Sequence, residues 1–231
     1  TFDKQFLAHI DVDIQHEWDD KMRDYMKKII ESKPDLRLMT LQITRVCHEY
    51  SIKEISYPNY YKIFEMKGKI YSKDEMFYEA SKNIDWLKLQ LGKDVELAVE
   101  NNNYLPAESY NIVTDGDFLT EIVNENSIGF LFDLAHAQVT AKNKKISLKN
   151  YVSSLPMDRM IQMHICKPLI PDNGIAYDAH EAPDHAMFED VLDISKKYEG
   201  LKYFTVEYYK DHEMLIRSLR QLKRTLSKLK K

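Results

Sequence analysis

Acidic and histidine side chains recur along the second half of this chain, most of them at or near the end of a short apolar run. They are Glu100, Asp133, His136, His164, Asp178, His180 and Glu207. Four of these stretches have the apolar pattern of buried parallel strands. In a barrel of parallel strands, chemistry is placed at the C-terminal ends of the strands. The sequence therefore predicts that these side chains converge on one mouth of such a barrel.

Carboxylate and imidazole groups gathered in one place would repel and desolvate one another. Divalent metal ions remove that cost, because they neutralise carboxylates and accept neutral imidazole as a ligand. The spacings Asp133-x-x-His136 and Asp178-x-His180 allow two side chains of one loop to reach a single metal cluster. For each residue alone, a helix cap or a hydrogen-bonded structural group is the alternative interpretation. Their number and order together favour a metal site.

Strand and helix patterns alternate along the chain. Apolar or alternating runs predict strands over residues 6–14, 36–46, 95–100, 128–134, 160–165 and 203–209. Helical spacing of apolar residues predicts helices over residues 16–33, 73–92 and 212–231, and near 114–126 and 184–198. Residues 50–70, rich in aromatic side chains, fit neither period and are interpreted as an irregular loop insertion. The alternation indicates βαβ units and a parallel sheet.

The predicted fold class is α/β, a (β/α)8 TIM barrel in which residues 1–231 form a single metal-binding domain. No linker or change of composition divides the chain. Only the strands named above are predicted, whereas a closed barrel of this type needs about eight. Either two strands lie in irregular segments, or the first two strands of the usual fold are absent and the N-terminal part is incomplete.

Composition argues against several classes of protein. The formal net charge of −4 disfavours a surface for non-specific nucleic-acid binding. No apolar run reaches the roughly 18 residues of a membrane span, so no membrane partner is expected. The two cysteines lie far apart, which fits a reducing compartment and predicts a cytoplasmic protein. The six glycines form no phosphate-binding or dinucleotide-binding loop.

In their order along the chain, the acidic and histidine residues resemble the metal ligands of the xylose isomerase-like barrel superfamily, and most closely its multinuclear branch. Endonuclease IV enzymes of that branch carry the order Glu, Asp-x-x-His, His, Asp-x-His, Glu around a trinuclear zinc site. The resemblance also implies an early histidine ligand, which His9 would supply; an ordinary buried histidine is the alternative. A further upstream histidine of the pattern has no match, and Gln42 or His48 would take its place.

The stretches around these residues resemble the multinuclear non-haem iron oxidative enzymes. The shared pieces are ENNNY, FDLAHAQVTAKN, YVSSLPMDRMIQMHI and YDAHEAP, of which Leu155 to His164 is the most diagnostic. They lie within residues 95–211, and residues 1–94 resemble the family only loosely. The resemblance implies a metal-dependent oxidoreductase with two or three divalent metal ions, iron favoured and zinc or manganese as alternatives. Such enzymes use oxygen to remodel a residue of a ribosomal peptide, often a cysteine, usually with a partner protein that presents the peptide.

Other functions remain open. A sugar isomerase or epimerase of the same superfamily holds one metal, although His136 and the Asp178-x-His180 pair favour a multinuclear site. An endonuclease IV-like zinc phosphodiesterase fits the ligand order but not the acidic charge balance. A degenerate barrel kept as a binding module is the non-catalytic alternative.

Several chemically capable residues lie outside the predicted site. His16, His185 and His212 stand at predicted helix starts and are interpreted as caps or solvated residues. Cys166 follows His164 by two residues, but nothing in the sequence marks a partner that would activate it as a nucleophile.

Overall fold

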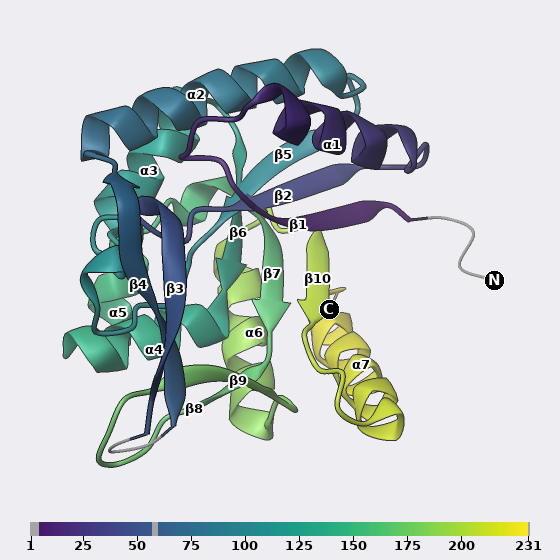
Figure 1. Ribbon diagram of the computed structural model, residues 1–231. Helices are drawn as coiled ribbons and strands as arrows, with labels where there is room; N and C mark the ends of the chain where they lie inside the picture. Colours follow the sequence, from purple (N-terminus) through teal and green to yellow (C-terminus); the bar gives the residue numbers. More distant parts are fainter. Residues whose placement is uncertain (1–4, 57–59, 231) are drawn as a thin grey trace.

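The computed structural model describes residues 5–56 and 60–230 (Figure 1). The strands of its main sheet are β1 (Leu7–Asp13), β2 (Leu38–Gln42), β5 (Glu96–Glu100), β6 (Gly129–Asp133), β7 (Met160–Ile165) and β10 (Tyr203–Val206). They lie in the order β1-β2-β5-β6-β7-β10, and every neighbouring pair is parallel. Each strand falls inside a range predicted from the sequence, which confirms the parallel sheet.

The two faces of this sheet carry different side chains, because successive residues of a strand point to opposite sides. One face is apolar and joins the helices in a buried cluster, with Met39, Leu41, Leu97, Val99, Phe130, Phe132, Met163 and Ile165. The alternating positions hold polar groups, namely Thr40, Gln42, Glu100, Asp133, Gln162 and His164. Burial of the apolar face against helices therefore leaves the polar groups on the inner face of the sheet.

The sheet curls around its polar face. Thr40 on β2 donates a hydrogen bond of 2.8 Å to Gln162 on β7, although β5 and β6 lie between these strands. In a flat sheet, strands three positions apart would be roughly 14 Å from each other. The bond therefore requires strong curvature. Within the described ranges no ladder joins β1 to β10, so the sheet is an open half-barrel.

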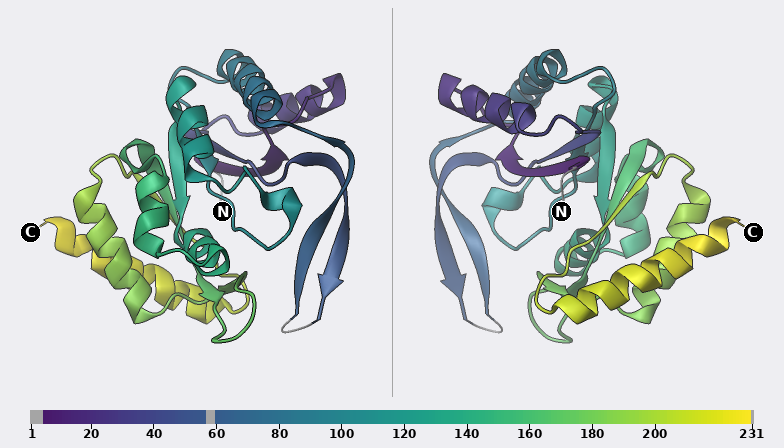
Figure 2. Two further views of the ribbon diagram at one scale, coloured as in Figure 1. Left: turned by 90° about the vertical axis from the view of Figure 1, so that its left-hand side faces the viewer. Right: turned by 90° about the vertical axis from the view of Figure 1, so that its right-hand side faces the viewer.

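Helices cover the outside of the curled sheet (Figure 2). They are α1 (Asp20–Glu31), α2 (Lys73–Gln90), α3 (Gly116–Glu125), α4 (Leu134–Lys144), α5 (Leu148–Ser154), α6 (His185–Lys197) and α7 (His212–Leu226), with short 3-10 turns η1 (Glu108–Tyr110), η2 (Met157–Arg159) and η3 (Ser227–Lys230). The predicted helices correspond to α1, α2, α3, α6 and α7, and α4 and α5 are additional. Within the described ranges, none of the helices combines the length and the hydropathy that a membrane span requires.

Two antiparallel hairpins accompany the main sheet. The first consists of β3 (Cys47–Ile55) and β4 (Tyr61–Ile70), and the second of β8 (Lys167–Leu169) and β9 (Tyr177–Glu181). The interpretation of residues 50–70 as an irregular loop is therefore wrong, apart from residues 57–59, which lie outside the described ranges. The β3–β4 strands are largely exposed on both faces, so no buried apolar face imposes an alternating pattern on their sequence. Both hairpins form separate sheets and add no strand to the half-barrel.

Candidate metal centre

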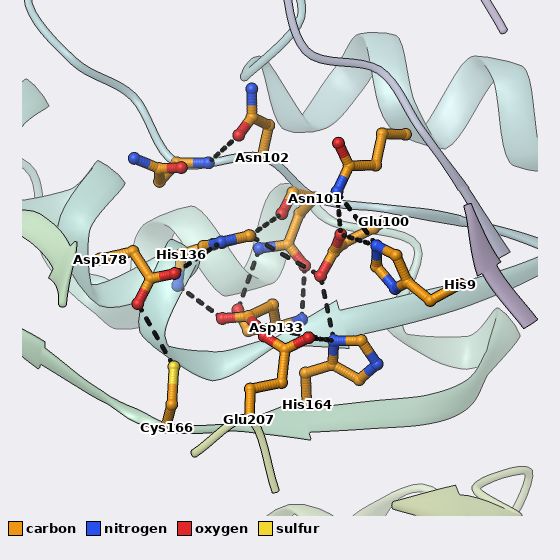
Figure 3. Close-up of polar contacts among 12 residues, drawn as sticks. His9, Glu100, Asn101, Asn102, Asp133, His136, His164, Cys166, Asp178 and Glu207 are labelled. Atoms are coloured by element: carbon orange, nitrogen blue, oxygen red, sulfur yellow. Dashed lines mark hydrogen bonds and ion pairs between the residues drawn. The ribbon is translucent and has the colours of Figure 1, made fainter. Parts of the chain in front are cut away.

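The C-terminal ends of three strands, with the residue that follows β10, carry the central acidic and histidine side chains. Glu100 is the last residue of β5, Asp133 is the last residue of β6, and Glu207 follows β10 directly. His164, near the end of β7, lies opposite Asp133 in the register of the two strands. Because parallel strands end at the same edge of a sheet, these four side chains meet at one mouth of the half-barrel (Figure 3).

Helix α4 positions His136. Asp133 is the N-cap of this helix, and its Oδ1 accepts a hydrogen bond of 2.7 Å from the backbone N–H of His136. The ring Nδ1 of His136 lies 2.8 Å from the carbonyl oxygen of Asn101. A carbonyl oxygen can only accept, so Nδ1 carries the proton and Nε2 is left free to bind a cation. That nitrogen lies 3.4 Å from Asp178 Oδ2.

The β8–β9 hairpin supplies Asp178 and His180. They are two residues apart on β9, and their side chains contact each other. His180 Nε2 lies 3.1 Å from Asp178 Oδ2 and 3.5 Å from Glu207 Oε2. His180 has a backbone φ of 45°, in the left-handed region that a residue with a Cβ rarely adopts. Such strain persists where the surroundings impose it, and it is concentrated at functional sites.

The deepest ligand atoms lack hydrogen-bond partners. Glu100 Oε1, Asp133 Oδ2 and His164 Nδ1 are all buried, and none has a partner with hydrogen-bond geometry. His164 Nδ1 nevertheless lies 3.3 Å from Glu100 Oε1, 4.0 Å from Asp133 Oδ2 and 2.9 Å from Glu207 Oε1. Leaving a buried polar group unsatisfied costs about 1–3 kcal/mol, and more for a charged group. A bound cation requires ligand atoms that point to one place and are not used in hydrogen bonds with one another. These three atoms meet that requirement, so the residues present fit a metal ion.

The ligand atoms form three groups, and in each group they lie within 4.8 Å of one another. The groups are His9 with His164 and Glu207; Glu100 with Asp133 and His136; and Cys166 with His180 and Glu207. Glu207 belongs to two of them. These groups contain all the predicted ligands except Asp178, which contacts them through His136 and His180, and they add Cys166. The sequence contains a signal for Cys166, since it stands two residues after His164 and alternate residues of an extended chain share a face.

The buried imidazoles and carboxylates of this site shift one another's pKa values. Burial opposes protonation of His164, but the Glu100 and Glu207 carboxylates outweigh it and raise the pKa of His164 to about 10. Burial likewise opposes ionisation of Glu207, but the neighbouring His164 and His180 imidazoles hold the pKa of its carboxyl well below the usual range. Burial raises the pKa of the Asp133 carboxyl to about 7. A bound cation would replace the imidazole protons, so metal binding is expected to release protons.

His9 and Gln42 lie at the edge of the cluster. His9 Nε2 is 3.4 Å from Glu100 Oε2 and 3.0 Å from Gln42 Nε2, and its ring stacks on the ring of His164 at 5.0 Å between centroids. The Gln42 amide also donates to Glu100 Oε2 at 3.4 Å. His48, by contrast, packs edge-on against the ring of His16. Of the two candidates for the unmatched upstream histidine, Gln42 is therefore the one that contacts the site.

His16 is not the solvated or capping residue that the sequence suggested. It is buried, its ring stacks on Tyr71, and its Nε2 lies 3.0 Å from the carbonyl oxygen of Arg45. Burial lowers the pKa of His16. His185 and His212, by contrast, stand at the starts of α6 and α7, as expected, and His185 is largely exposed.

A cavity of ≈ 570 Å³ opens beside the cluster. His136, Asp178 and His180 form one side, and aromatic residues of the β3–β4 hairpin, including Tyr50 and Phe64, form another. The Arg45 guanidinium lies over both aromatic rings, 4.1 Å from Tyr50 and 4.9 Å from Phe64. The hairpin therefore forms one wall of a cavity that reaches the candidate ligands.

Comparison with known proteins relates most of the chain to one family. The model of the family described as RiPP precursor modification enzyme MbnB/TglH/ChrH, where RiPP denotes a ribosomally synthesised and post-translationally modified peptide, matches residues 70–223. A UPF0276 protein of Caulobacter sp. (strain K31) is 29% identical over 107 residues, which cover 45% of this chain and 37% of that protein. A UPF0276 protein of Vibrio parahaemolyticus is 28% identical over 91 residues, covering 38% of this chain and 32% of that protein. The matched part thus spans about a third of the length of these curated relatives.

Solved structures share the fold at low sequence identity. The 3-keto-D-glucoside 4-epimerase YcjR from E. coli gives a TM-score of 0.53 at 13% identity, over 98% of this chain and 79% of that chain. The D-psicose 3-epimerase from Clostridium cellulolyticum H10 gives 0.51 at 14% identity, over 98% and 78%. The crystal structure of AsfvAP:AG gives 0.55 at 13% identity, over 97% and 74%. These similarities support the xylose isomerase-like TIM-barrel fold class.

Proposed function

This chain belongs to the MbnB/TglH/ChrH family of RiPP precursor modification enzymes, and we infer that it is a metal-dependent enzyme acting on a ribosomal peptide. More specifically, we propose an oxidoreductase with a multinuclear iron centre. The proposed ligands are His9, Glu100, Asp133, His136, His164, Asp178, His180 and Glu207. The observation that carries the metal centre is the convergence of Glu100 Oε1, Asp133 Oδ2 and His164 Nδ1, which are buried without hydrogen-bond partners.

The ligand set suits iron, since mixed imidazole and carboxylate ligands bind it and leave positions open for a substrate. Bound iron would supply redox chemistry with dioxygen. The role of the protein is to hold these groups in place and to balance charge. Asp133, buried between β6 and α4, and Glu100 contribute negative charge in the interior, where charge interactions are strongest. The Asn101 carbonyl fixes the ring of His136, so that its free nitrogen faces Asp178.

The peptide is proposed to enter through the cavity between the ligand cluster and the β3–β4 hairpin. The cavity reaches His136, Asp178 and His180, so a peptide side chain lying there would contact the outer part of the centre. The wall formed by Tyr50 and Phe64 offers aromatic surface that peptide side chains can bury. A partner protein that presents the peptide remains part of the proposal.

The test begins with protein purified without oxygen. Elemental analysis should give more than one transition-metal equivalent per chain. The iron-loaded protein should then consume oxygen and change the mass of a candidate peptide encoded near its gene. The same preparation should be assayed for epimerisation of ketoses and for nicking of abasic DNA. Failure to bind iron, zinc or manganese after reconstitution would remove the metal centre from the proposal.

His180→Ala separates the proposed centre from a mononuclear sugar isomerase. The variant removes a ligand that a set of Glu100, Asp133, His164 and Glu207 does not use, so it should lower the metal stoichiometry and abolish peptide modification. His185→Ala is the matched control, because the His185 side chain is 81% exposed and is ion-paired with Glu189, away from the cluster. Sugar epimerisation that survives His180→Ala would instead establish the isomerase alternative.

A further inference from the structure

We propose that Cys166 is a thiolate ligand of the metal centre. It would bind at the end of the centre where His180 and Glu207 lie. The inference rests on the proposed metal centre and adds to it a ligand of different chemistry. Carboxylate and imidazole ligands are compatible with many divalent ions. A thiolate is a soft ligand, and it favours iron, cobalt or zinc over magnesium, calcium or manganese.

The end of β7 directs Cys166 toward the site. Cys166 directly follows this strand and stands two residues after His164, and both side chains are fully buried. In an extended chain, residues two apart share a face, so Cys166 points to the same side as His164. Figure 3 shows its sulfur directed at Asp178, to whose Oδ1 the thiol donates at 3.3 Å. The ligand atoms of Cys166, His180 and Glu207 lie within 4.8 Å of one another.

The second observation is an unpartnered buried nitrogen that lies against Glu207, a member of the Cys166 group. His164 is almost fully buried, its Nδ1 has no hydrogen-bond partner, and that atom lies 2.9 Å from Glu207 Oε1. Glu207 is the residue that the Cys166 group shares with the His9–His164 group. The unpartnered atoms and the sulfur therefore belong to one continuous cluster, and Cys166 is not an isolated thiol.

Binding would convert the thiol to a thiolate. The S–H bond breaks, the sulfur forms a bond to the metal, and the proton passes to solvent; no oxidant or reductant is needed. The competing interpretation is a buried structural cysteine that only donates a hydrogen bond to Asp178. The two interpretations differ in one measurable property, the presence of a metal–sulfur bond.

Cobalt(II) provides the probe, because thiolate ligation gives an intense near-ultraviolet charge-transfer band that carboxylate and imidazole ligands do not give. The wild-type metal-free protein, titrated anaerobically without added thiols, should develop this band. Cys166→Ser should bind cobalt but lack the band. Cys47→Ser is the matched control, since Cys47 is the other free cysteine, is equally buried, and lies at the start of β3. It should keep the band.

X-ray absorption of the zinc-loaded wild-type protein tests for the same metal–sulfur bond without a substitution. The proposal can therefore be tested even if Cys166→Ser fails to fold. A sulfur shell at about 2.3 Å from the metal is expected. Cobalt or zinc bound with no sulfur signal, or a band that persists in Cys166→Ser, would overturn the role of Cys166 while leaving the metal centre standing. Absence of any bound metal would overturn both.

Discussion

At the scale of single residues, Asn101 holds the candidate centre together without being one of its proposed ligands. It follows Glu100 at the end of β5 and is fully buried. Its side-chain amide donates to the Asp133 carbonyl at 3.0 Å and accepts from the Asp133 N–H at 2.8 Å. Its own carbonyl orients His136. Asn101 is therefore a positioning residue for two ligands on a neighbouring strand and helix.

Asn101→Ala should lower metal affinity by roughly 10–100-fold, the usual effect of removing a group that orients a ligand. It also leaves the backbone groups of Asp133 without their partners, which should cost about 1–3 kcal/mol of unfolding free energy. Affinity is measured by competition with a chelator, and stability by thermal melting of the metal-free protein.

Asn126→Ala separates these two effects. Asn126 is also a buried asparagine, and its amide donates to Ser81 and to the Ile122 carbonyl at the end of α3. Its loss should destabilise the protein by a comparable amount and leave metal affinity unchanged. Equal loss of affinity in both variants would show that Asn101 acts only through global stability.

At the scale of elements, the β3–β4 hairpin lines the cavity beside the ligand cluster. In both side views it projects away from the curled sheet (Figure 2). A two-stranded hairpin alone is at best marginally stable in water. Here Arg45 lies over Tyr50 and Phe64, and Ser109 donates to the Phe64 carbonyl at 2.6 Å. These contacts fix the aromatic wall of the cavity.

Tyr50→Ala should raise the KM for the peptide by roughly tenfold, which corresponds to about 1.4 kcal/mol of lost binding. The kcat should change little, because the wall contacts substrate and transition state alike. Tyr78→Ala on α2 is the control: Tyr78 is also an exposed tyrosine with a cation over its ring, from Lys82, but it does not line the cavity. A fall in kcat at constant KM would contradict the assignment of Tyr50 to peptide binding.

At the scale of the whole molecule, the candidate centre connects distant parts of the chain. Its groups come from β1, β5, β6, β7 and β9, from helix α4, and from the residue after β10. In the described ranges, no hydrogen-bonded ladder joins the two edge strands β1 and β10 of the half-barrel. A bound metal would therefore link parts of the chain that the sheet itself does not hold together.

Chelation should therefore lower the melting temperature. A metal held at 100 times its Kd stabilises the native state by about 2.7 kcal/mol, which for a chain of this size is roughly 5–10 °C. Differential scanning calorimetry before and after verified metal removal measures the change. Identical melting temperatures would mean that no resident metal contributes to the native state.

The destabilisation on chelation should increase with pH. In the metal-free protein the pKa of His164 is raised from 6.5 to about 10, so the stability gained from its protonation is complete below 6.5 and is lost as the pH rises toward 10. The raised pKa of Asp133, about 7, acts in the same direction. The lowered pKa of Glu207 contributes stability that is lost only in acid. Melting curves at about pH 6 and about pH 9 should show a larger gap between metal-loaded and metal-free protein at the higher pH.

The sequence by itself determined the parallel strands and most candidate ligands. Each strand of the half-barrel has a local signature, a short apolar run that packs against helices. Because the strands are parallel, the direction of the chain alone predicts that the polar residues at their ends lie at the same edge of the sheet. The pairs at 133 and 136 and at 178 and 180 could be recognised because both members lie on one short segment. Positions such as Glu100 and His164 need only the rule that parallel strands end at one edge.

The tertiary structure alone decided which further side chains reach the site. The β3–β4 hairpin has no buried face, so its sequence lacks the alternation of apolar and polar residues that would predict strands. The burial of His16 and the contact of Gln42 with Glu100 depend on residues distant in sequence. Cys166 enters the cluster because β9 folds back against β8 and brings His180 beside it. Such contacts are set by how elements pack, which no local pattern of residues encodes.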